Sequence, residues 1–287
     1  MQETNKKVNS CNGECSGCES ASSCSVNNFQ LKLNDYSHIK TIIGVVSGKG
    51  GVGKSMISSL LAVTLAEKGL NVGIMDADIT GPSIAKTFNV KEKAYGQNNL
   101  IYPHITEKYN IKVMSSNMLL ENDDDPIVWR GSLISNLVKQ FYTDVFWGKL
   151  DVLLIDMPPG TGDVALTTFQ SIPLDGIVMV TTPQDLVSMI VSKACKMANM
   201  MNVKIMGVVE NMAYVECPNC HEKIYLYGKS KTIDLIKPYN LDLLASLPIN
   251  PQLTELVNEG RIEEYEGNYL DSVANKIISN IDIGDAD

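Results

Sequence analysis

Short runs of apolar residues, each ended by small, turn-forming or acidic residues, recur along most of the chain. Within each run the apolar residues are continuous rather than alternating with polar ones, which is typical of strands that are covered on both faces. The strands predicted in this way are Ile42–Ser47, Val72–Asp76, Ile111–Ser115, Val152–Asp156, Ile177–Thr181, Ile205–Val209 and Leu243–Leu247.

Amphipathic stretches of helical length lie between these runs. The predicted helices include Ser55–Lys68, Ser132–Phe146, Leu186–Met200 and Gln252–Glu259. Strands that alternate with helices favour a parallel sheet with right-handed crossovers. We therefore predict a three-layer α/β fold, in which a doubly wound, mostly parallel sheet carries helices on both faces.

Residues 1–30 are rich in serine, asparagine, glycine and cysteine and contain almost no apolar side chains. We predict that they form a Cys-rich tail that is disordered unless a metal organises it. Residues 31–287 are then the α/β domain. The acidic run Glu121–Asp125 is interpreted as a solvated loop, since Pro126 follows it directly.

Composition and charge narrow the class of protein. The 287 residues are 44% apolar, enough to bury a core, and 24 basic against 33 acidic residues give a net charge of −9. This charge argues against nucleic acid or an anionic membrane as a partner, since both require a basic face. No apolar run reaches the roughly 18–20 residues that span a bilayer, and residues 1–18 have no apolar stretch typical of a signal peptide. We expect a soluble, cytoplasmic protein.

A glycine-rich loop follows the first predicted strand and opens the first predicted helix. It reads Gly48-Lys49-Gly50-Gly51-Val52-Gly53-Lys54-Ser55 and satisfies the phosphate-loop pattern G-x-x-x-x-G-K-[ST] without adjustment. Its glycines let backbone amides converge on phosphate oxygens, and the helix N-terminus favours negative charge. Lys54 is expected to reach the β- and γ-phosphates of ATP, and the Ser55 hydroxyl is expected to bind Mg²⁺.

Two other predicted strands end in acidic residues at the same edge of the sheet. Asp156 is interpreted as the carboxylate that holds Mg²⁺ through its water shell. Asp78 is a candidate to orient the attacking water, and Asp76 is expected to lie nearer the metal. The alternative role of a helix N-cap accounts for one of these three residues more readily than for all of them.

The phosphate loop contains a second lysine, Lys49. A side chain at this position can cross a two-fold interface to the phosphates of a second copy, which would make hydrolysis depend on dimerisation.

The loop GKGGVGKS resembles the variant phosphate loop of the MinD/ParA/ArsA/nitrogenase-iron-protein superclass. Further segments are similar to its Mrp/ApbC branch, the iron–sulfur cluster carrier ATPases, over roughly residues 40–280: DADITGPS (76–83), WRG (129–131), QFYTDVFWGKLDVLLIDMPPGTGDVALT (140–167), TTPQ (181–184), GVVENM (207–212) and CPNC (217–220). The resemblance implies that Asn211 contacts the adenine ring and that the loop near Leu247 and Pro248 closes over it. Ser132 departs from the family, in which proline commonly follows WRG.

Four of the seven cysteines lie in the tail, at Cys11, Cys15, Cys18 and Cys24. The last three resemble the N-terminal cluster motif of eukaryotic cytosolic relatives and of some prokaryotic Mrp proteins, whereas the short gap after Cys11 departs from the eukaryotic pattern. Four thiolates on a flexible segment can bind a 4Fe–4S cluster or a tetrahedral zinc. We favour the cluster and keep zinc as the alternative.

A second pair, Cys217 and Cys220, lies in a predicted insertion at about residues 213–230. Two thiolates are half of a closed four-ligand site, and a symmetric dimer would supply the other two. The resemblance implies a labile 4Fe–4S cluster bridging two protomers at this place. A zinc site is the main alternative, and a redox pair and, with His221, a haem-attachment motif are weaker ones. Cys195 lies in an apolar helical pattern and is interpreted as a core residue.

The expected function is therefore that of an ATP-hydrolysing carrier, a homodimer that receives a 4Fe–4S cluster from a donor and transfers it to apoproteins. One alternative is a MinD- or ParA-like positioning ATPase with structural zinc at the cysteine pair. Its membrane-bound form would need a basic amphipathic C-terminal helix, and residues 272–287 contain one lysine. Another alternative is an electron-transfer ATPase like the nitrogenase iron protein, for which residues 156–163 lack the cysteines.

Overall fold

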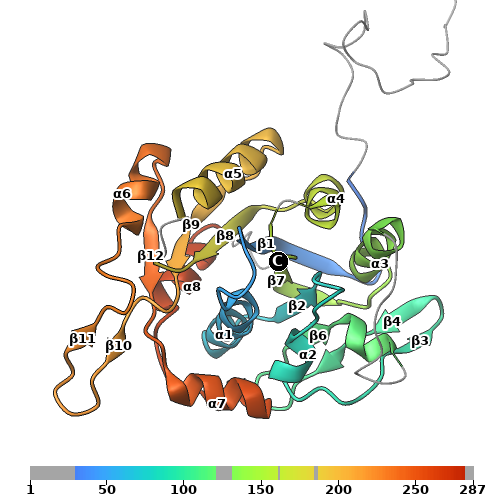
Figure 1. Ribbon diagram of the computed structural model, residues 1–287. Helices are drawn as coiled ribbons and strands as arrows, with labels where there is room; N and C mark the ends of the chain where they lie inside the picture. Colours follow the sequence, from blue (N-terminus) through green and yellow to red (C-terminus); the bar gives the residue numbers. More distant parts are fainter. Residues whose placement is uncertain (1–29, 121–130, 161, 184–186, 282–287) are drawn as a thin grey trace, which may run out of the picture.

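The computed structural model describes residues 30–120, 131–160, 162–183 and 187–281 (Figure 1). In this part of the chain, eight strands form the main sheet in the order β12-β9-β8-β1-β7-β2-β6-β5. The pairs are parallel except at the edge, where β5 is antiparallel to β6. The strands are β1 (His38–Ser47), β2 (Val72–Asp76), β5 (His104–Ile105), β6 (Lys112–Met114), β7 (Lys149–Asp156), β8 (Gly176–Thr181), β9 (Ile205–Glu210) and β12 (Leu243–Ser246).

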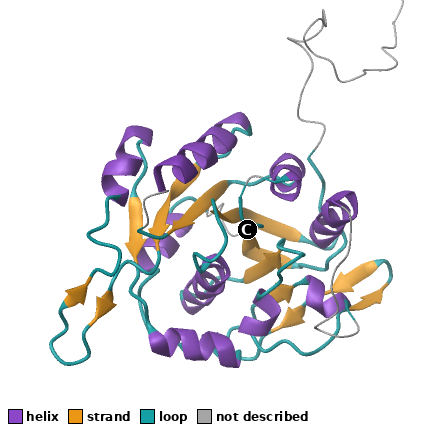
Figure 2. Ribbon diagram, viewed as in Figure 1, coloured by secondary structure: helices purple, strands orange, loops and turns teal. Residues whose placement is uncertain are grey.

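Helices cover both faces of this sheet, as Figure 2 shows. One face carries α3 (Gly131–Thr143), α4 (Asp163–Ser171), α5 (Val187–Met200) and α6 (Thr232–Ile236). The other carries α1 (Lys54–Glu67), α2 (Ile84–Thr87), α7 (Pro251–Glu259) and α8 (Asp271–Ile278). Two short hairpins lie outside the sheet, β3 (Tyr95–Gln97) with β4 (Leu100–Tyr102), and β10 (Val215–Glu216) with β11 (Lys223–Ile224).

The central strand β1 shows why its sequence is continuously apolar. Ile42 and Val46 belong to the core on the α3–α6 face, whereas Ile43 and Val45 belong to the core on the α1 face. Since successive side chains of a strand point to opposite faces, burial on both sides requires apolar residues at every position. The predicted three-layer fold is confirmed.

Each of the seven predicted strands is present, but one predicted helix ends earlier than expected. The sequence predicts Ser132–Phe146, and α3 ends at Thr143. The next residues leave the helix because Ile101, from the β3–β4 hairpin, pairs with the backbone of Asp144 and Phe146 at N–O distances of 2.8 Å. Cys195 is 4% exposed, which confirms its assignment to the core.

The strand register brings the predicted polar residues to one edge of the sheet. Asp156 of β7 is the register partner of both Val45 of β1 and Asp76 of β2. The carboxyl ends of parallel strands are the edge at which such sheets bind ligands. Within the described ranges, no helix is long and apolar enough to cross a membrane.

Helix α3 offers a matched test of the core. Leu137 is 7% exposed, whereas Leu133, one turn earlier on the same helix, is 55% exposed. Leu137→Ala is expected to lower the free energy of unfolding by about 2–5 kcal/mol, because it removes buried methyl groups and leaves a cavity. Leu133→Ala should change it by less than about 0.5 kcal/mol. Urea unfolding measures both, and equal costs would contradict the assigned packing.

Candidate functional site

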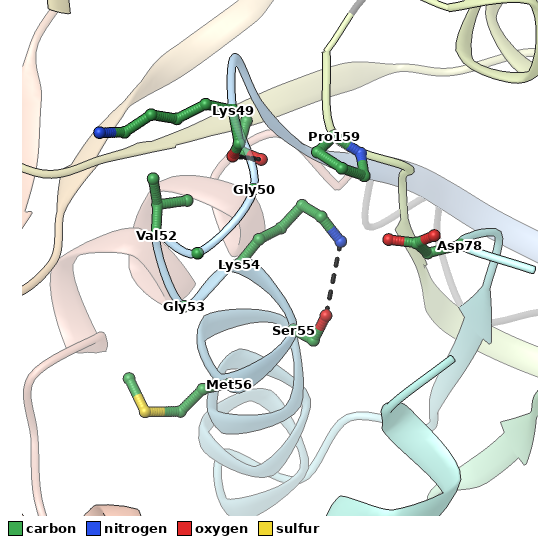
Figure 3. A pocket seen from close by; sticks show the side chains of 11 residues that line it. Lys49, Gly50, Val52, Gly53, Lys54, Ser55, Met56, Asp78 and Pro159 are labelled. Carbon is green, nitrogen blue, oxygen red and sulfur yellow. Dashed lines mark hydrogen bonds between the residues drawn. The ribbon is translucent and has the colours of Figure 1, made fainter. Parts of the chain in front are cut away.

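The glycine-rich loop joins the carboxyl end of β1 to α1 and surrounds a cavity of about 240 Å³ (Figure 3). Gly51 and Gly53 both have φ of 78°, a left-handed conformation that side chains with a Cβ rarely adopt. Residues 47, 49–56, 78 and 159 line the cavity. Backbone amides of such a loop, together with the N-terminus of the following helix, form an anion-binding site.

The carboxylate of Asp156, at the end of β7, contacts two of the side chains that line this cavity. It is fully buried and contacts Lys54 Nζ at 2.7 Å and Ser55 Oγ at 2.6 Å through Oδ2. Its other oxygen, Oδ1, accepts a hydrogen bond from Ser58 Oγ at 2.6 Å. These contacts join α1 to β7 and satisfy a charge that would be costly to bury alone.

Ser58 was missed by the sequence analysis. It lies four residues after Lys54 on α1 and therefore on the same helix face, so its spacing was a usable signal. Its hydroxyl also donates to the carbonyl oxygen of Lys54 at 3.1 Å. Ser58 thus fixes Oδ1 of Asp156, which orients Oδ2 toward Lys54 and Ser55.

Asp76, at the end of β2, is held by protein donors. Its Oδ2 accepts hydrogen bonds from the amides of Ser83 and Ile84 at 3.0 and 3.1 Å and from Ser115 Oγ at 3.2 Å. Its Oδ1 accepts from the amide of Asp78 at 3.1 Å. The carboxylate therefore fixes the loop between β2 and α2, the kind of capping role weighed for one of the three aspartates.

The electrostatic environments of the two aspartates after β2 differ. Burial, and after it the negative charge of Asp156, raise the pKa of Asp76 to about 7. Asp78 is partly buried and lines the cavity. Burial raises its pKa above the usual value, although the positive charge of Lys54 opposes the shift. Figure 3 shows the Asp78 carboxylate directed toward the Lys54 ammonium group. Asp78 is thus the one of this pair that faces the phosphate loop.

The second loop lysine points elsewhere. In Figure 3 the side chain of Lys49 extends away from Lys54 and Asp78. Its backbone carbonyl accepts a hydrogen bond from Ser47 Oγ at 3.0 Å, which fixes the first turn of the loop. The structure therefore does not bring Lys49 together with the other candidate catalytic side chains.

Asn211 lies directly against the phosphate loop. Its Nδ2 donates to the carbonyl oxygen of Val52 at 2.9 Å, and a Cβ at Gly53 would lie only 2.3 Å from the same Nδ2. The side chain is 1% exposed, and within the described residues its Oδ1 has no hydrogen-bond partner. The segment that contains Pro248 runs beside it, because the amide of Leu247 donates to the carbonyl of Glu210 at 2.8 Å.

The cysteine pair lies on the β10–β11 hairpin, away from the phosphate cavity. Cys220 is exposed and Cys217 is partly exposed. The amides of Cys220 and then Asn219 lower the pKa of the Cys217 thiol, which favours the thiolate that binds metals. His221 is exposed, and its Nδ1 lies 2.7 Å from Glu216 Oε1.

Among the described residues, no group of three or more histidine, cysteine or acidic side chains has the geometry to hold a metal ion. The four tail cysteines lie outside the described residues, as do Glu121–Asp125 and the first two residues of the WRG segment. The cysteine hairpin is therefore the exposed thiol site that the described chain contains.

Comparison with known proteins places the chain in a family. The model of the NUBPL iron-transfer P-loop NTPases, within the ParA group, matches residues 38–282. The chain is 44% identical over 270 residues to an iron-sulfur cluster carrier protein of Clostridium perfringens, covering 88% of this chain and 94% of the relative. A protein of the same name from Saccharolobus solfataricus is 41% identical, with 88% and 84% of the two chains covered.

Solved structures agree with this placement. A nucleotide-binding protein in complex with ADP from Archaeoglobus fulgidus is 44% identical and has a TM-score of 0.74, covering 81% of this chain and 91% of that chain. The cell division ATPase MinD of Pyrococcus furiosus, 20% identical with a TM-score of 0.57 over 84% of this chain and 99% of its own, shares the fold. The chain belongs to the iron-transfer family of P-loop NTPases.

Proposed function

We propose that the protein is an ATP-hydrolysing iron–sulfur cluster carrier. ATP with Mg²⁺ occupies the phosphate loop, and a transferable 4Fe–4S cluster is held between two copies of the chain by Cys217 and Cys220. The observation that carries the proposal is the combination of a complete phosphate loop with an exposed thiol pair on a separate hairpin. The cluster is cargo, received from a donor and passed to apoproteins.

The nucleotide half rests on the contacts of Asp156. Phosphate oxygens in the cavity would compete with Asp156 for the ammonium group of Lys54, now 2.7 Å from the carboxylate. Mg²⁺ prefers oxygen ligands, and the Ser55 hydroxyl and Asp156 carboxylate, 2.6 Å apart, are a suitable donor set. A divalent cation there would also offset the repulsion between Asp156 and Asp76, its register partner on the adjacent strand β2.

The hydrolytic step is assigned to residues that face the cavity. Asp78 orients the attacking water, and Lys54 stabilises the charge that develops on the transferred phosphoryl group. Lys49 is assigned to the phosphates of a second copy, and the direction of its side chain, away from Lys54 and Asp78, supports this assignment (Figure 3). Asn211 is assigned to the adenine ring, for which its unpaired, buried Oδ1 is a suitable acceptor.

The cluster half rests on ligand number and exposure. A 4Fe–4S cluster takes four thiolates, and the hairpin supplies two, so a two-fold dimer completes the set. Amides directed at Cys217 stabilise its thiolate. A site on an exposed hairpin leaves the cluster open to an acceptor protein. A second cluster, or zinc, is assigned to the cysteine tail.

Removing the loop lysine tests the nucleotide site. Lys54→Ala is expected to reduce ATP hydrolysis by about 100-fold or more, because the charge that neutralises the phosphates is lost. Lys40→Ala is the matched control, since Lys40 is 42% exposed and pairs with the partly buried Asp151, and it should hydrolyse ATP normally. Steady-state phosphate release measures both. Wild-type turnover by Lys54→Ala would show that the phosphate site is elsewhere.

Asp78→Asn separates catalysis from affinity. The amide keeps the size of the side chain but orients water poorly, so turnover should fall by about 10²–10⁴-fold while the ATP dissociation constant stays near the wild-type value. Asp35→Asn, at an exposed position, is the control. Single-turnover hydrolysis and equilibrium binding of ATP give the two quantities. If binding and turnover fell together, Asp78 would be reassigned to metal binding.

Metal analysis tests the bridging cluster and needs a chain in which the tail contributes no thiols. In a full-length variant with the four tail cysteines changed to serine, anaerobic reconstitution should load one 4Fe–4S cluster per two chains. Adding Cys217→Ala or Cys220→Ala should abolish that cluster and its transfer to an apo acceptor, whereas the buried Cys195→Ala should retain it. Iron, acid-labile sulfide and absorption spectra measure the loading. Stoichiometric zinc with no reconstitutable iron would favour the positioning-ATPase alternative.

A further inference from the structure

Glu210 is a buried acidic residue that the proposed reactions do not use. It is the last residue of β9 and is 1% exposed. The hydroxyls of Ser230 and Thr232 donate to its Oε1, and the hydroxyl of Ser246 donates to Oε2 at 3.3 Å. A carboxylate taken out of water depends on such donors, so losing one of them is costly.

These donors mark where the cysteine segment returns to the fold. Ser230 follows the β10–β11 hairpin, and Thr232 is the first residue of α6. The Thr232 amide also donates to Ser230 Oγ at 3.1 Å, which makes the two residues one unit. The carboxylate of Glu210 therefore holds the far end of the segment that carries the cysteines.

The near end of the same segment is held by the neighbouring backbone. The amide of Ala213 donates to the carbonyl of Leu247, and the amide of Leu247 donates to the carbonyl of Glu210, both at 2.8 Å. The amide of Ile249 donates to the carbonyl of Tyr214 at 2.8 Å. Both ends of the cysteine segment thus meet at Glu210, one through its side chain and one through its backbone.

Glu210 is also covalently joined to Asn211, the residue that contacts the phosphate loop. The next residue, Asn211, donates its Nδ2 to the carbonyl of Val52 at 2.9 Å, and its amide donates to the carbonyl of Thr181 at 2.8 Å. A displacement of the phosphate loop that moves Asn211 would also move the backbone of Glu210. The hydroxyls of Ser230 and Thr232 must follow, because separation would leave the buried Oε1 of Glu210 without the two hydroxyls that donate to it.

We propose that Glu210 is a positioning residue that couples the phosphate loop to the cysteine hairpin through Ser230 and Thr232. The inference rests on the proposed cluster site. The coupling is reciprocal: a cluster bound at the hairpin changes the affinity for ATP, and ATP changes the affinity for the cluster by the same factor. Glu210 contacts neither ligand in this arrangement and acts through the segment that it holds.

The test compares ATP affinity with and without the bridging cluster, using a fluorescent ATP analogue and full-length protein whose four tail cysteines are changed to serine. This protein, called wild type below, is reconstituted with iron and sulfide. In the wild type, the cluster should change the ATP dissociation constant by about fivefold or more. In Ser230→Ala/Thr232→Val this ratio should fall to near one, while the dissociation constant of the cluster-free protein stays unchanged. Of the two single variants at position 232, Thr232→Ser keeps the hydroxyl and should keep the wild-type ratio of ATP dissociation constants, whereas Thr232→Val should lower this ratio.

Thr168→Val is the matched control, because Thr168 is also a buried threonine whose hydroxyl is bonded, to the Val164 carbonyl of α4 at 2.8 Å. It should keep the wild-type ratio, which separates coupling from a general loss of stability. A double variant that binds ATP normally but no longer retains the cluster would equally support the positioning role.

Two results would overturn the inference. One is a bound cluster with an ATP affinity ratio of one in the wild type, and the other is an unchanged ratio in Ser230→Ala/Thr232→Val. Either leaves the proposed carrier function intact, since the cluster is still bound. Wild-type protein that binds no cluster at Cys217 and Cys220 overturns the proposed function, and the coupling with it.

Discussion

The ion pair between Asp156 and Lys54 is the contact on which the nucleotide site depends. Asp156 ends a strand in the middle of the sheet, and Lys54 begins the helix that follows the phosphate loop. Both side chains are buried, so neither charge is accommodated without the other. With Ser55 and Ser58 hydrogen-bonded to the same carboxylate, the helix is fixed at its first turn. The C-terminal end of the glycine-rich loop is thereby fixed, which holds the backbone amides of the loop in one arrangement.

The carboxyl edge of the sheet carries both the phosphate loop and the cysteine segment. The phosphate loop follows β1, near the middle of the sheet, while the cysteine segment follows β9, nearer one edge. Between them stand only β8 and the residues that end it. The hydrogen bond from the Asn211 amide to the Thr181 carbonyl joins the residue after β9 to the last residue of β8. Parallel strands make this proximity possible because they all deliver their following loops to the same side.

The sequence predicted those features whose chemistry is local. Continuous apolar runs located the strands, and the spacing within Gly48–Ser55 located the phosphate loop, since both patterns are set by neighbours in the chain. What could not be predicted depends on distant partners. Ser115 and Ile84 fix the carboxylate of Asp76, and Ile101 ends α3 after Thr143. Glu210 was not singled out from the sequence, because its hydroxyl partners at Ser230 and Thr232 lie beyond the cysteine insertion, and no periodicity reveals where that insertion returns to the fold.

The close approach of Asn211 to Gly53 also restricts how this family can diverge. Any side chain at position 53 would displace the amide of Asn211, and a smaller residue at 211 that made room for it would no longer hold the carbonyl of Val52. Although they are far apart in the sequence, the side chains at these two positions therefore compete for the same space. A substitution at one position alone would produce a protein with either a steric clash or a lost hydrogen bond. Positions 53 and 211 should accordingly remain fixed, or change together, when lineages separate.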